Sequence, residues 1–478
     1  MTSAKKVTII GAGVAGLVAA YELERLGHQV EVLEGSRRIG GRIHTHRFRS
    51  GPAGPLVELG AMRIPTKHQH TMHYIAQLGL TDKVRDFETL FSKSGNHHAS
   101  SAGYLSVREA AGVMTEDLRR VLSGERYSDE TVLFGAWLMA IGNAIAPADF
   151  RNILREEFLL ELLDLVERID LTLFLHGGAK EHVDLHSFFA AHPEVKSSFR
   201  GRLSHFINDI LNETSPELVR LEGGMDQLVC RLAERIQGPI TRSQEVIGLE
   251  VQEDAVLVHV RDSDYIVNRH CDYVLCTIPF SILRRLWLNG LSGAKIAAIH
   301  SVKYWSATKV ALHCREAFWE RDGISGGAAF ASGRIRQAYY PPVEGDPACG
   351  AALLASYTIG CDADLLGCMP AAIRHEFVIQ ELGKMHPELL CPGMVVGTVS
   401  FAWGQNRWSG GAGAVRWGKD TITCEEERVH AAQPENRLFF AGEHCSSTPA
   451  WIEGAIESAV NAVREIHFHQ PRTRLALA

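Results

Sequence analysis

The chain has 478 residues, of which 46% are hydrophobic, which is enough for two to three domains with large buried cores. A net charge of −7 and a pI near 6.4 give no reason to expect a nucleic-acid partner or an anionic membrane surface. No stretch reaches the roughly 18 uncharged apolar residues of a membrane span, and the N-terminus has no signal-peptide core, so we expect a cytoplasmic protein without a membrane partner.

The first predicted elements along the chain form a strand–helix–strand unit. Residues 7–10 are a short apolar run that ends at Gly11, and residues 14–25 then show helical spacing. Gly27 ends this helix, and residues 30–33 form a second apolar run. The unit fits within the roughly 30 residues of a mononucleotide-binding motif.

The turn between the first strand and the helix has the pattern GxGxxG, with the sequence Gly11-Ala12-Gly13-Val14-Ala15-Gly16. Gly11 permits a tight turn, Gly13 lets a pyrophosphate approach the backbone, and Gly16 lets the helix pack on the strand. The helix N-terminus offers N–H groups to phosphates, and Glu34, at the end of the next strand, can accept hydrogen bonds from a ribose. The turn is compatible with NAD and with FAD.

The rest of the chain contains a long helical region followed by further strands. Residues 88–222 are predicted to be mainly helical. We predict strands at 246–260, 273–277, 309–313, 351–359 and 437–441, a glycine-rich loop at 409–418 and a helix at 451–467. Strand and helix signals at both ends of a helical middle predict a discontinuous nucleotide-binding domain.

A metal site is not expected, although the chain has 23 histidines. Several lie close together, as His68, His70 and His73 do, but none is beside a matching cysteine or carboxylate cluster at ligand spacing.

Residues 34–42, with the sequence EGSRRIGGR, resemble the E-x-x-x-R-x-G-G-R signature of the flavin monoamine oxidase family. Arg38 and Arg42 could neutralise a diphosphate, and Gly40-Gly41 would let the main chain run beneath a planar ring system. Many members carry an arginine where Ser36 stands, so one ribose-side contact differs here.

Later segments match the same family in the same order. Residues 223–226 (GGMD) resemble its GGM turn, and Val246 matches a strand residue whose backbone pairs with adenine. Residues 441–444 (AGEH) resemble the C-terminal flavin motif, in which the glutamate bonds the ribityl chain. The resemblance implies FAD as cofactor.

The fold class that the resemblance implies is α/β (α+β), a glutathione-reductase-like FAD fold with three domains. We expect a Rossmann-type, discontinuous FAD-binding domain from residues 1–65, 223–303 and 432–470. A mixed-sheet substrate-binding domain would come from 66–102 and 304–431, and a helical domain from 103–222.

Residues 60–65 (GAMRIP) resemble the G-x-M-R-x-P segment of the L-amino acid oxidase branch, in which the arginine binds the substrate α-carboxylate. A guanidinium fork suits this task because it matches two carboxylate oxygens. The alternative for Arg63 is a structural salt bridge to an internal acid. Tyr357 resembles the tyrosine that gives this carboxylate a second hydrogen bond.

Three further side chains complete the site by resemblance. Lys309 matches the flavin-facing lysine that assists the reaction with O2, although a lone lysine in a strand can also reach solvent at a sheet edge. Trp403 matches a residue near the isoalloxazine, and Trp451 matches the aromatic wall of the substrate pocket. Snake-venom-type members carry glycine where Ala450 stands, and no general base is assigned.

The expected catalytic residues are therefore Arg63, Lys309, Tyr357 and Trp451. The expected FAD-binding residues are Gly11, Gly13, Ala15, Gly16, Glu34, Arg38, Gly40, Gly41, Arg42, Met62, Arg63, Val246, Trp403, Gly442, Glu443, Trp451 and Ile452.

The function that the resemblance implies is FAD-dependent oxidation of an L-amino acid by O2 to the 2-oxo acid, with release of NH3 and H2O2, in an enzyme that we expect to be a homodimer. The alternatives are a flavin-dependent amino acid 2-monooxygenase that gives an amide, an amine or polyamine oxidase, and a non-catalytic flavoprotein. The sequence does not indicate which side chain is accepted.

Overall fold

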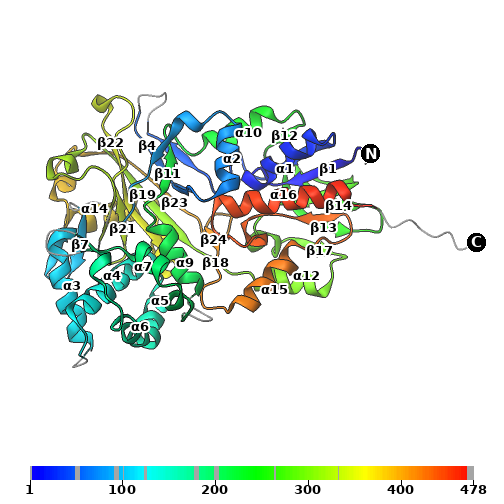
Figure 1. The fold of residues 1–478 in the computed structure, drawn as a ribbon. Coiled ribbons are helices and arrows are strands. Elements are labelled where there is room, and N and C mark those ends of the chain that lie inside the picture. Colours follow the sequence, from blue (N-terminus) through cyan, green and yellow to red (C-terminus); the bar gives the residue numbers. More distant parts are fainter. Residues whose placement is uncertain are drawn as a thin grey trace, which may run out of the picture.

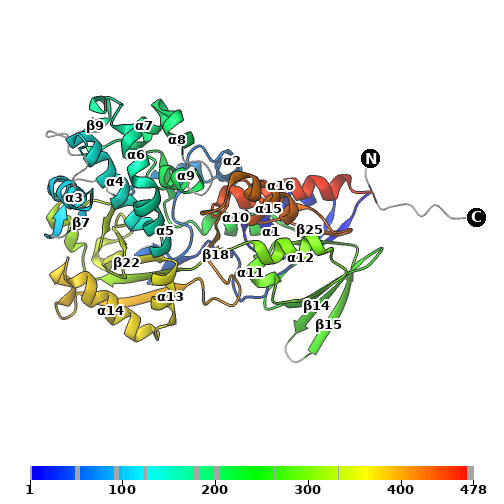
Figure 2. The same ribbon diagram turned by 90° about the horizontal axis from the view of Figure 1, so that it is seen from below.

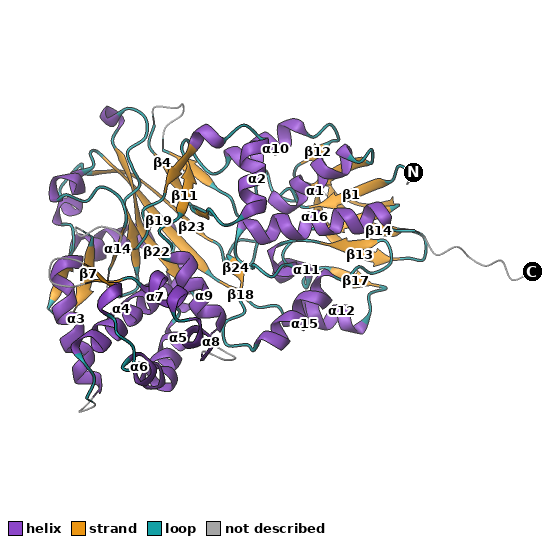
Figure 3. Cartoon of the chain, in the orientation of Figure 1, coloured by secondary structure: helices purple, strands orange, loops and turns teal. Residues whose placement is uncertain are grey.

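The fold is built around two large β-sheets, which lie toward opposite ends of the molecule (Figure 1). The computed structural model describes residues 3–48, 54–90, 96–100, 102–122, 126–176, 182–198, 204–262, 265–331 and 333–470. Helices cover both sheets, as the colouring of Figure 3 shows. This mixture of strands and helices is the predicted α/β class.

The first sheet has five parallel strands in the order β12-β2-β1-β16-β25. These strands are Ile240–Thr241, Gln29–Leu33, Lys6–Ile10, Tyr273–Cys276 and Leu438–Phe440. The residues of β16 and β25 are all buried, as a parallel sheet covered on both faces requires. The predicted strand–helix–strand unit forms its centre, with α1 at Val14–Arg25.

Helices cover one face of this sheet and a smaller sheet covers the other. Side chains of α1, α10 (Gln227–Arg235) and α16 (Ile452–Phe468) share one apolar core with β1 and β2. The opposite core holds α11 (Phe280–Leu283), α12 (Gly293–Ser301) and the four-stranded sheet β15-β14-β13-β17. The strands of this smaller sheet are Tyr265–Cys271, Val256–Asp262, Glu245–Val251 and Trp287–Asn289.

The single stretch of alternation predicted at 246–260 is in fact two strands. A turn at residues 252–255 folds β14 back antiparallel on β13, and the Gln252 N–H donates to the Ala255 carbonyl at 2.9 Å. The apolar alternation continues through both strands, so periodicity alone did not reveal the reversal.

The second large sheet is mixed, with seven strands in the order β23-β19-β22-β21-β20-β7-β8. Its strands are Val395–Ala402, Ala307–Cys314, Ala351–Ile359, Gln337–Tyr339, Ala328–Phe330, His97–Ser100 and Gly103–Ser106. Figure 2 shows helices on both sides, with α13 (Cys361–Cys368) and α14 (Ala371–Gly383) on one side and a larger helical group on the other. The predicted strands at 309–313 and 351–359 lie next to each other in this sheet as β19 and β22.

The larger group comes from the region predicted to be mainly helical. Its helices are α3 (Val107–Leu122), α4 (Asp129–Ile145), α5 (Ala148–Ile153), α6 (Leu159–Val166), α7 (Leu185–Ala191), α8 (Pro193–Ser198) and α9 (Ser204–Glu213). Short strands interrupt the region: β7 and β8 at its start, β9 (Leu175–His176) with β10 (His182–Val183), and β11 (Leu218–Leu221). Strand β11 pairs with β5 (Ile64–Pro65) and β6 (Val84–Asp86).

Two segments pack across the predicted domain boundaries. Tyr74 and Ile75 of α2 (Gln69–Gln77) lie in the core of α1 and α16, although residue 66 was the expected start of the substrate-binding domain. Val57 and Leu59 lie instead in the core of the helical group and the second sheet. The division into three domains stays a prediction.

Among the residues that the structure describes, no helix has the length and apolar character needed to cross a membrane. Within the same ranges, no three His, Cys, Asp or Glu side chains are grouped to hold a metal ion.

Candidate active site

A cavity opens where β1, β2 and β16 end, and it extends to the second sheet. The chain moves from β1 to β2 on one side and later to β16 on the other, and ligands of open α/β sheets bind at such a switch point. The expected residues that line this cavity are Gly11, Gly13, Ala15, Glu34, Arg38, Gly40, Gly41, Arg42, Val246, Lys309, Tyr357, Trp403, Gly442, Glu443, Trp451 and Ile452.

The glycine turn provides a cradle that side chains would fill. Gly11 has a φ of +104°, and a Cβ on Gly16 would lie 2.0 Å from the Gly11 carbonyl oxygen. Gly41 has a φ of +56°, and a Cβ there would lie 3.2 Å from the Cα of Gly13. Helix α1 begins after Gly13 with no side-chain cap and no acid in its first turn, so its N–H groups suit a phosphate. This part of the site fits a dinucleotide such as FAD.

Glu34, which we expected to bind a ribose, lines the cavity just after the end of β2. Its two carboxylate oxygens each accept a hydrogen bond of 2.8 Å, one from the Ala12 N–H and one from the Ser36 N–H. An ionised carboxylate has about four acceptor positions, so acceptors remain for hydroxyl groups. Ser36 thus fixes Glu34 through its backbone.

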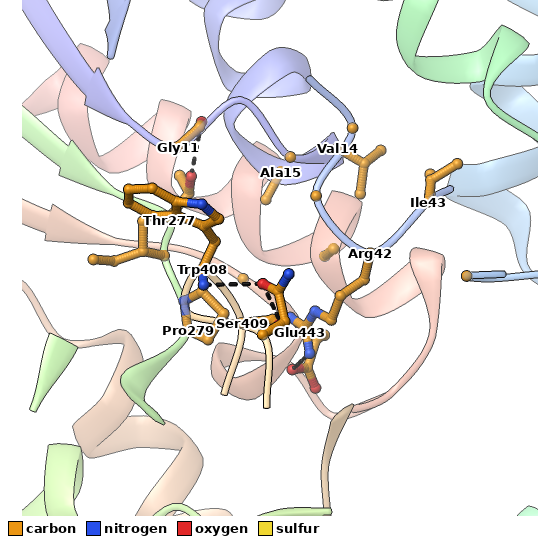
Figure 4. A pocket seen from close by; sticks show the side chains of 18 of the residues that line it. Gly11, Val14, Ala15, Arg42, Ile43, Thr277, Pro279, Trp408, Ser409 and Glu443 are labelled. Carbon is orange, nitrogen blue, oxygen red and sulfur yellow. Dashed lines mark hydrogen bonds and ion pairs between the residues drawn. The ribbon is translucent and has the colours of Figure 1, made fainter. Parts of the chain in front are cut away.

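Arg38 and Arg42 both have acceptors within the protein. Arg38 donates to the Ile43 carbonyl at 3.0 Å and also to the Gly41 carbonyl, and so fixes the loop between them. Arg42 pairs with Glu443 at 2.6 Å (Figure 4). Their expected role at a diphosphate stays a prediction.

Glu443 is buried next to Arg42 and follows β25, the last strand in the order of the parallel sheet. Burial alone would raise the pKa of its carboxyl, but Arg42, His444 and the Ala450 N–H outweigh burial and lower that pKa. The Ala450 N–H donates to Oε2 at 2.9 Å, and the Ala414 N–H, in β24 (Gly413–Ala414), donates at 3.1 Å. The carboxylate therefore joins three chain segments at one side of the cavity.

Lys309 reaches into the cavity from the middle of β19, where it is 3% exposed. Its Nζ donates to the carbonyls of Gly60 at 2.7 Å and Glu58 at 3.1 Å. Burial and the nearby Arg63 lower the pKa of this amine to about 7, although Glu58 opposes them. Because β19 pairs on both sides, the alternative of a lysine reaching solvent from a sheet edge is wrong.

Arg63 is buried, with 6% of its surface exposed, and unlike Gly60 and Ala61 it is not among the residues that line this cavity. Its Nη1 donates to the Tyr339 hydroxyl at 2.8 Å, and its Nη2 forms an ion pair with Glu213. The alternative salt bridge to an internal acid is therefore present in this structure.

Tyr357 lies close to both Lys309 and Arg63. Lys309 Nζ is 4.7 Å from the centre of its ring. Burial raises the pKa of its hydroxyl, and the charge of Arg63 and a hydrogen bond from it act in the opposite direction. The tyrosine and the arginine are thus adjacent, as the carboxylate-binding hypothesis requires.

The remaining expected residues lie around these groups. Trp403 donates from Nε1 to the Leu59 carbonyl at 2.8 Å, and Trp451 packs edge-on against His68 with ring centres 5.2 Å apart. Met62 is not part of the lining of this cavity; its sulfur is 3.3 Å from Lys309 Nζ, and it lines a smaller neighbouring cavity. Gly16 lies beneath the turn.

Sequence reasoning missed Trp408, which lines the cavity beside Gly11 and Thr277 (Figure 4). A Cβ on Gly35 would lie 2.3 Å from its indole ring, so only glycine allows this contact. Arg407 lies 4.6 Å from the centre of that ring and pairs with Glu245. The available signal was the position of Trp408 directly before the predicted glycine-rich loop at 409–418.

Glu213 and Tyr339 were also missed. They are 150 and 276 residues from Arg63 in the chain, and neither lies in a recognisable motif.

Comparisons with known proteins show similarity over nearly the whole chain. The family profile of flavin containing amine oxidoreductases matches residues 14–467. The chain is 63% identical over 462 residues to the flavin-dependent L-tryptophan oxidase RebO of Lentzea aerocolonigenes, covering 97% of this chain and 98% of that protein. It is 27% identical to an L-amino-acid oxidase of Gloydius blomhoffii, covering 97% and 89% of the two chains.

Among solved structures, a putrescine oxidase bound to putrescine matches with a TM-score of 0.64. The two chains are 20% identical, and the match covers 98% of this chain and 99% of that one. This likeness shows that the fold is the same.

Proposed function

Because the chain belongs to the flavin-containing amine oxidoreductase family, we propose that it is an FAD-dependent L-amino acid oxidase. The reaction converts an L-amino acid, O2 and water to the 2-oxo acid, NH3 and H2O2. The single observation that carries this proposal is the buried Arg63 guanidinium beside Tyr357 and close to Lys309, because a site for amines alone does not need a buried cation.

FAD, when bound, supplies the oxidant that accepts a hydride from the substrate Cα. The protein residues position the substrate: Arg63 and Tyr357 hold its carboxylate, and Trp403 and Trp451 restrict its plane. Near neutral pH, the Lys309 amine either carries a proton or, when it is neutral, accepts a hydrogen bond from a water molecule at its Nζ. Positioning provides most of the rate increase in this scheme, and no strong base is required.

We propose L-tryptophan as the substrate of this chain. The support is the 63% identity, over nearly the full length of both chains, to a protein described as an L-tryptophan oxidase. We also propose that the enzyme acts in the cytoplasm, and that it is a homodimer, as the family resemblance implies.

The test is anaerobic reduction of the bound flavin by L-tryptophan, D-tryptophan, other L-amino acids and tryptamine. Of these compounds, we expect only L-tryptophan to cause rapid loss of the oxidised flavin absorbance. Exposure to air should then restore this absorbance, with one H2O2 and one 2-oxo acid formed per flavin reduced. An amide product would indicate a monooxygenase, and equal reduction by tryptamine would indicate an amine oxidase. No reduction by any of these compounds would contradict an enzymatic role in amine oxidation.

A further inference from the structure

Glu213 forms an ion pair with the Arg63 guanidinium, the group that the proposed function assigns to the substrate carboxylate. The Arg63 side chain is 5% exposed, whereas the Glu213 side chain is 24% exposed. The arginine is therefore fixed inside the protein, and its carboxylate partner reaches it from a more accessible position.

The position of Glu213 is not explained by the stability of its own helix. Glu213 is the last residue of α9, which has no basic residue in its last turn. A carboxylate at a helix C-terminus faces the negative end of the helix dipole, so it is unfavourable there unless a cation compensates. Arg63, from a distant segment, is that cation.

Neighbouring side chains limit the part of the Arg63 guanidinium that a further ligand could contact. Nη1 already binds the Tyr339 hydroxyl, and the rings of Phe87 and Tyr339 lie 5.7 and 5.8 Å from its central carbon. A substrate carboxylate that used Nη2 would meet Glu213 at the same nitrogen. Two carboxylates that share one cation in a buried site repel each other strongly, so they exclude one another.

The side chain of Glu213 can leave without a movement of the helix. The Thr89 hydroxyl donates to the Glu213 backbone carbonyl at 2.5 Å and so holds the end of α9 in place. Rotation of the side chain alone would then take the carboxylate from Arg63 toward solvent.

We infer that Glu213 is an internal competitor for the carboxylate site: it pairs with Arg63 in the empty enzyme and is displaced by the α-carboxylate of the substrate. This inference rests on the proposed function of Arg63. It makes Glu213 a specificity-determining residue, because only a ligand whose side chain contributes further binding free energy displaces it. Small carboxylates such as acetate are excluded, and the buried cation is never left unpaired.

The experiment uses the FAD-loaded enzyme and two ligands that cannot be oxidised as amino acids. Indole-3-acetate carries a carboxylate, and indole-3-acetamide has the same shape without a charge. Their Kd values are measured from the change in flavin absorbance, for the wild type, Glu213→Gln and the control Glu217→Gln. Glu217 is a nearby acid whose Oε2 accepts a hydrogen bond from Thr66 at 3.2 Å.

The expected result is an indole-3-acetate Kd at least 10-fold lower in Glu213→Gln, with the amide Kd unchanged and both values unchanged in Glu217→Gln. An unchanged or higher Kd for indole-3-acetate in Glu213→Gln overturns the inference. Should Glu213→Gln fail to retain FAD, Glu213→Asp replaces it, because the shorter acid keeps the charge but reaches Arg63 less well, and the same direction is expected.

An Arg63→Gln variant separates this inference from the proposed function. The proposed function itself would be contradicted if Arg63→Gln bound indole-3-acetate as tightly as the wild type and oxidised L-tryptophan at an unchanged rate. Loss of binding in Arg63→Gln with no effect of Glu213→Gln would contradict the role of Glu213 alone.

Discussion

At the scale of single residues, the titration of Lys309 can be followed in the stability of the protein. Its amine has a pKa of about 7 in the folded protein, against about 10.4 for an unperturbed lysine. Between these values the unfolded chain binds more protons than the folded chain, so the free energy of unfolding rises with pH across this window. Below pH 7 both states are protonated, and the full cost of the buried cation remains.

We predict that Lys309→Met removes this rise. The free energy of unfolding of the variant minus that of the wild type should decrease by roughly 2–3 kcal/mol between pH 7 and pH 9.5, because only the wild type gains stability, at about 1.4 kcal/mol per pKa unit. Urea unfolding at several pH values measures it. Glu58, whose pKa burial raises to about 7, produces the opposite slope below pH 7, so the comparison is restricted to higher pH. A difference that does not change with pH would contradict the perturbed amine.

At the scale of elements, the turn before α16 contains a residue in an unfavourable conformation. Ala450 has a φ of +64°, in the left-handed region where glycine is favoured. A glycine, the residue that snake-venom-type members carry at this position, would adopt this conformation without strain. The backbone N–H of Ala450 binds Glu443, which keeps the turn in this conformation.

We predict that Ala450→Gly increases the free energy of unfolding by about 0.5–1 kcal/mol, because the relief of strain exceeds the added flexibility of the unfolded chain. Thermal unfolding of the FAD-loaded enzyme measures the change. The matched control is Ala459→Gly, in the middle of α16, which should destabilise by about 1 kcal/mol. Equal destabilisation by both changes would show that the turn is not strained.

The loop that carries Trp408 leads to a second prediction at this scale. Because the indole lies against Gly35 in the cavity, Trp408→Ala should raise the Kd for FAD roughly tenfold or more, through loss of a large buried aromatic surface. Titration of the FAD-depleted protein, followed by flavin fluorescence, measures it. Trp287→Ala, at an exposed tryptophan of β17, is the control and should leave the Kd unchanged. An unchanged Kd in Trp408→Ala would exclude this contact.

The elements that could be predicted from sequence are those with a local pattern. The strand–helix–strand unit around Gly11 was predictable because apolar runs, glycines and Glu34 fall within one short segment. The hairpin between β13 and β14 was missed because the same alternation runs through both strands. A salt bridge of Arg63 to an internal acid was an open alternative, but Glu213 could not be identified as the partner because their pairing depends on packing between segments 150 residues apart.

At the scale of the whole molecule, the cavity joins the two large sheets. Its lining comes from β1 and β2, from the segment around Val246, from β19 and from the residues that follow β25. A ligand that binds all of these at once should stabilise the entire fold. Such a ligand stabilises by an amount that depends on its concentration relative to Kd.

We predict that FAD removal lowers Tm, and that adding FAD at 100 times its Kd restores about 2.7 kcal/mol of stability. Thermal unfolding at increasing FAD concentration measures this, with NAD as the control ligand. An identical Tm with and without FAD would contradict binding in this cavity.

The order of the strands in the parallel sheet also bears on how the enzyme matures. Strands β1 and β2 are synthesised first, but β25, Glu443 and α16 lie at residues 438–468. A nascent chain that is still on the ribosome without these residues lacks one side of the dinucleotide site. We therefore expect the complete cofactor site to form only after this last segment has been translated, so that a chain truncated before it should not retain FAD.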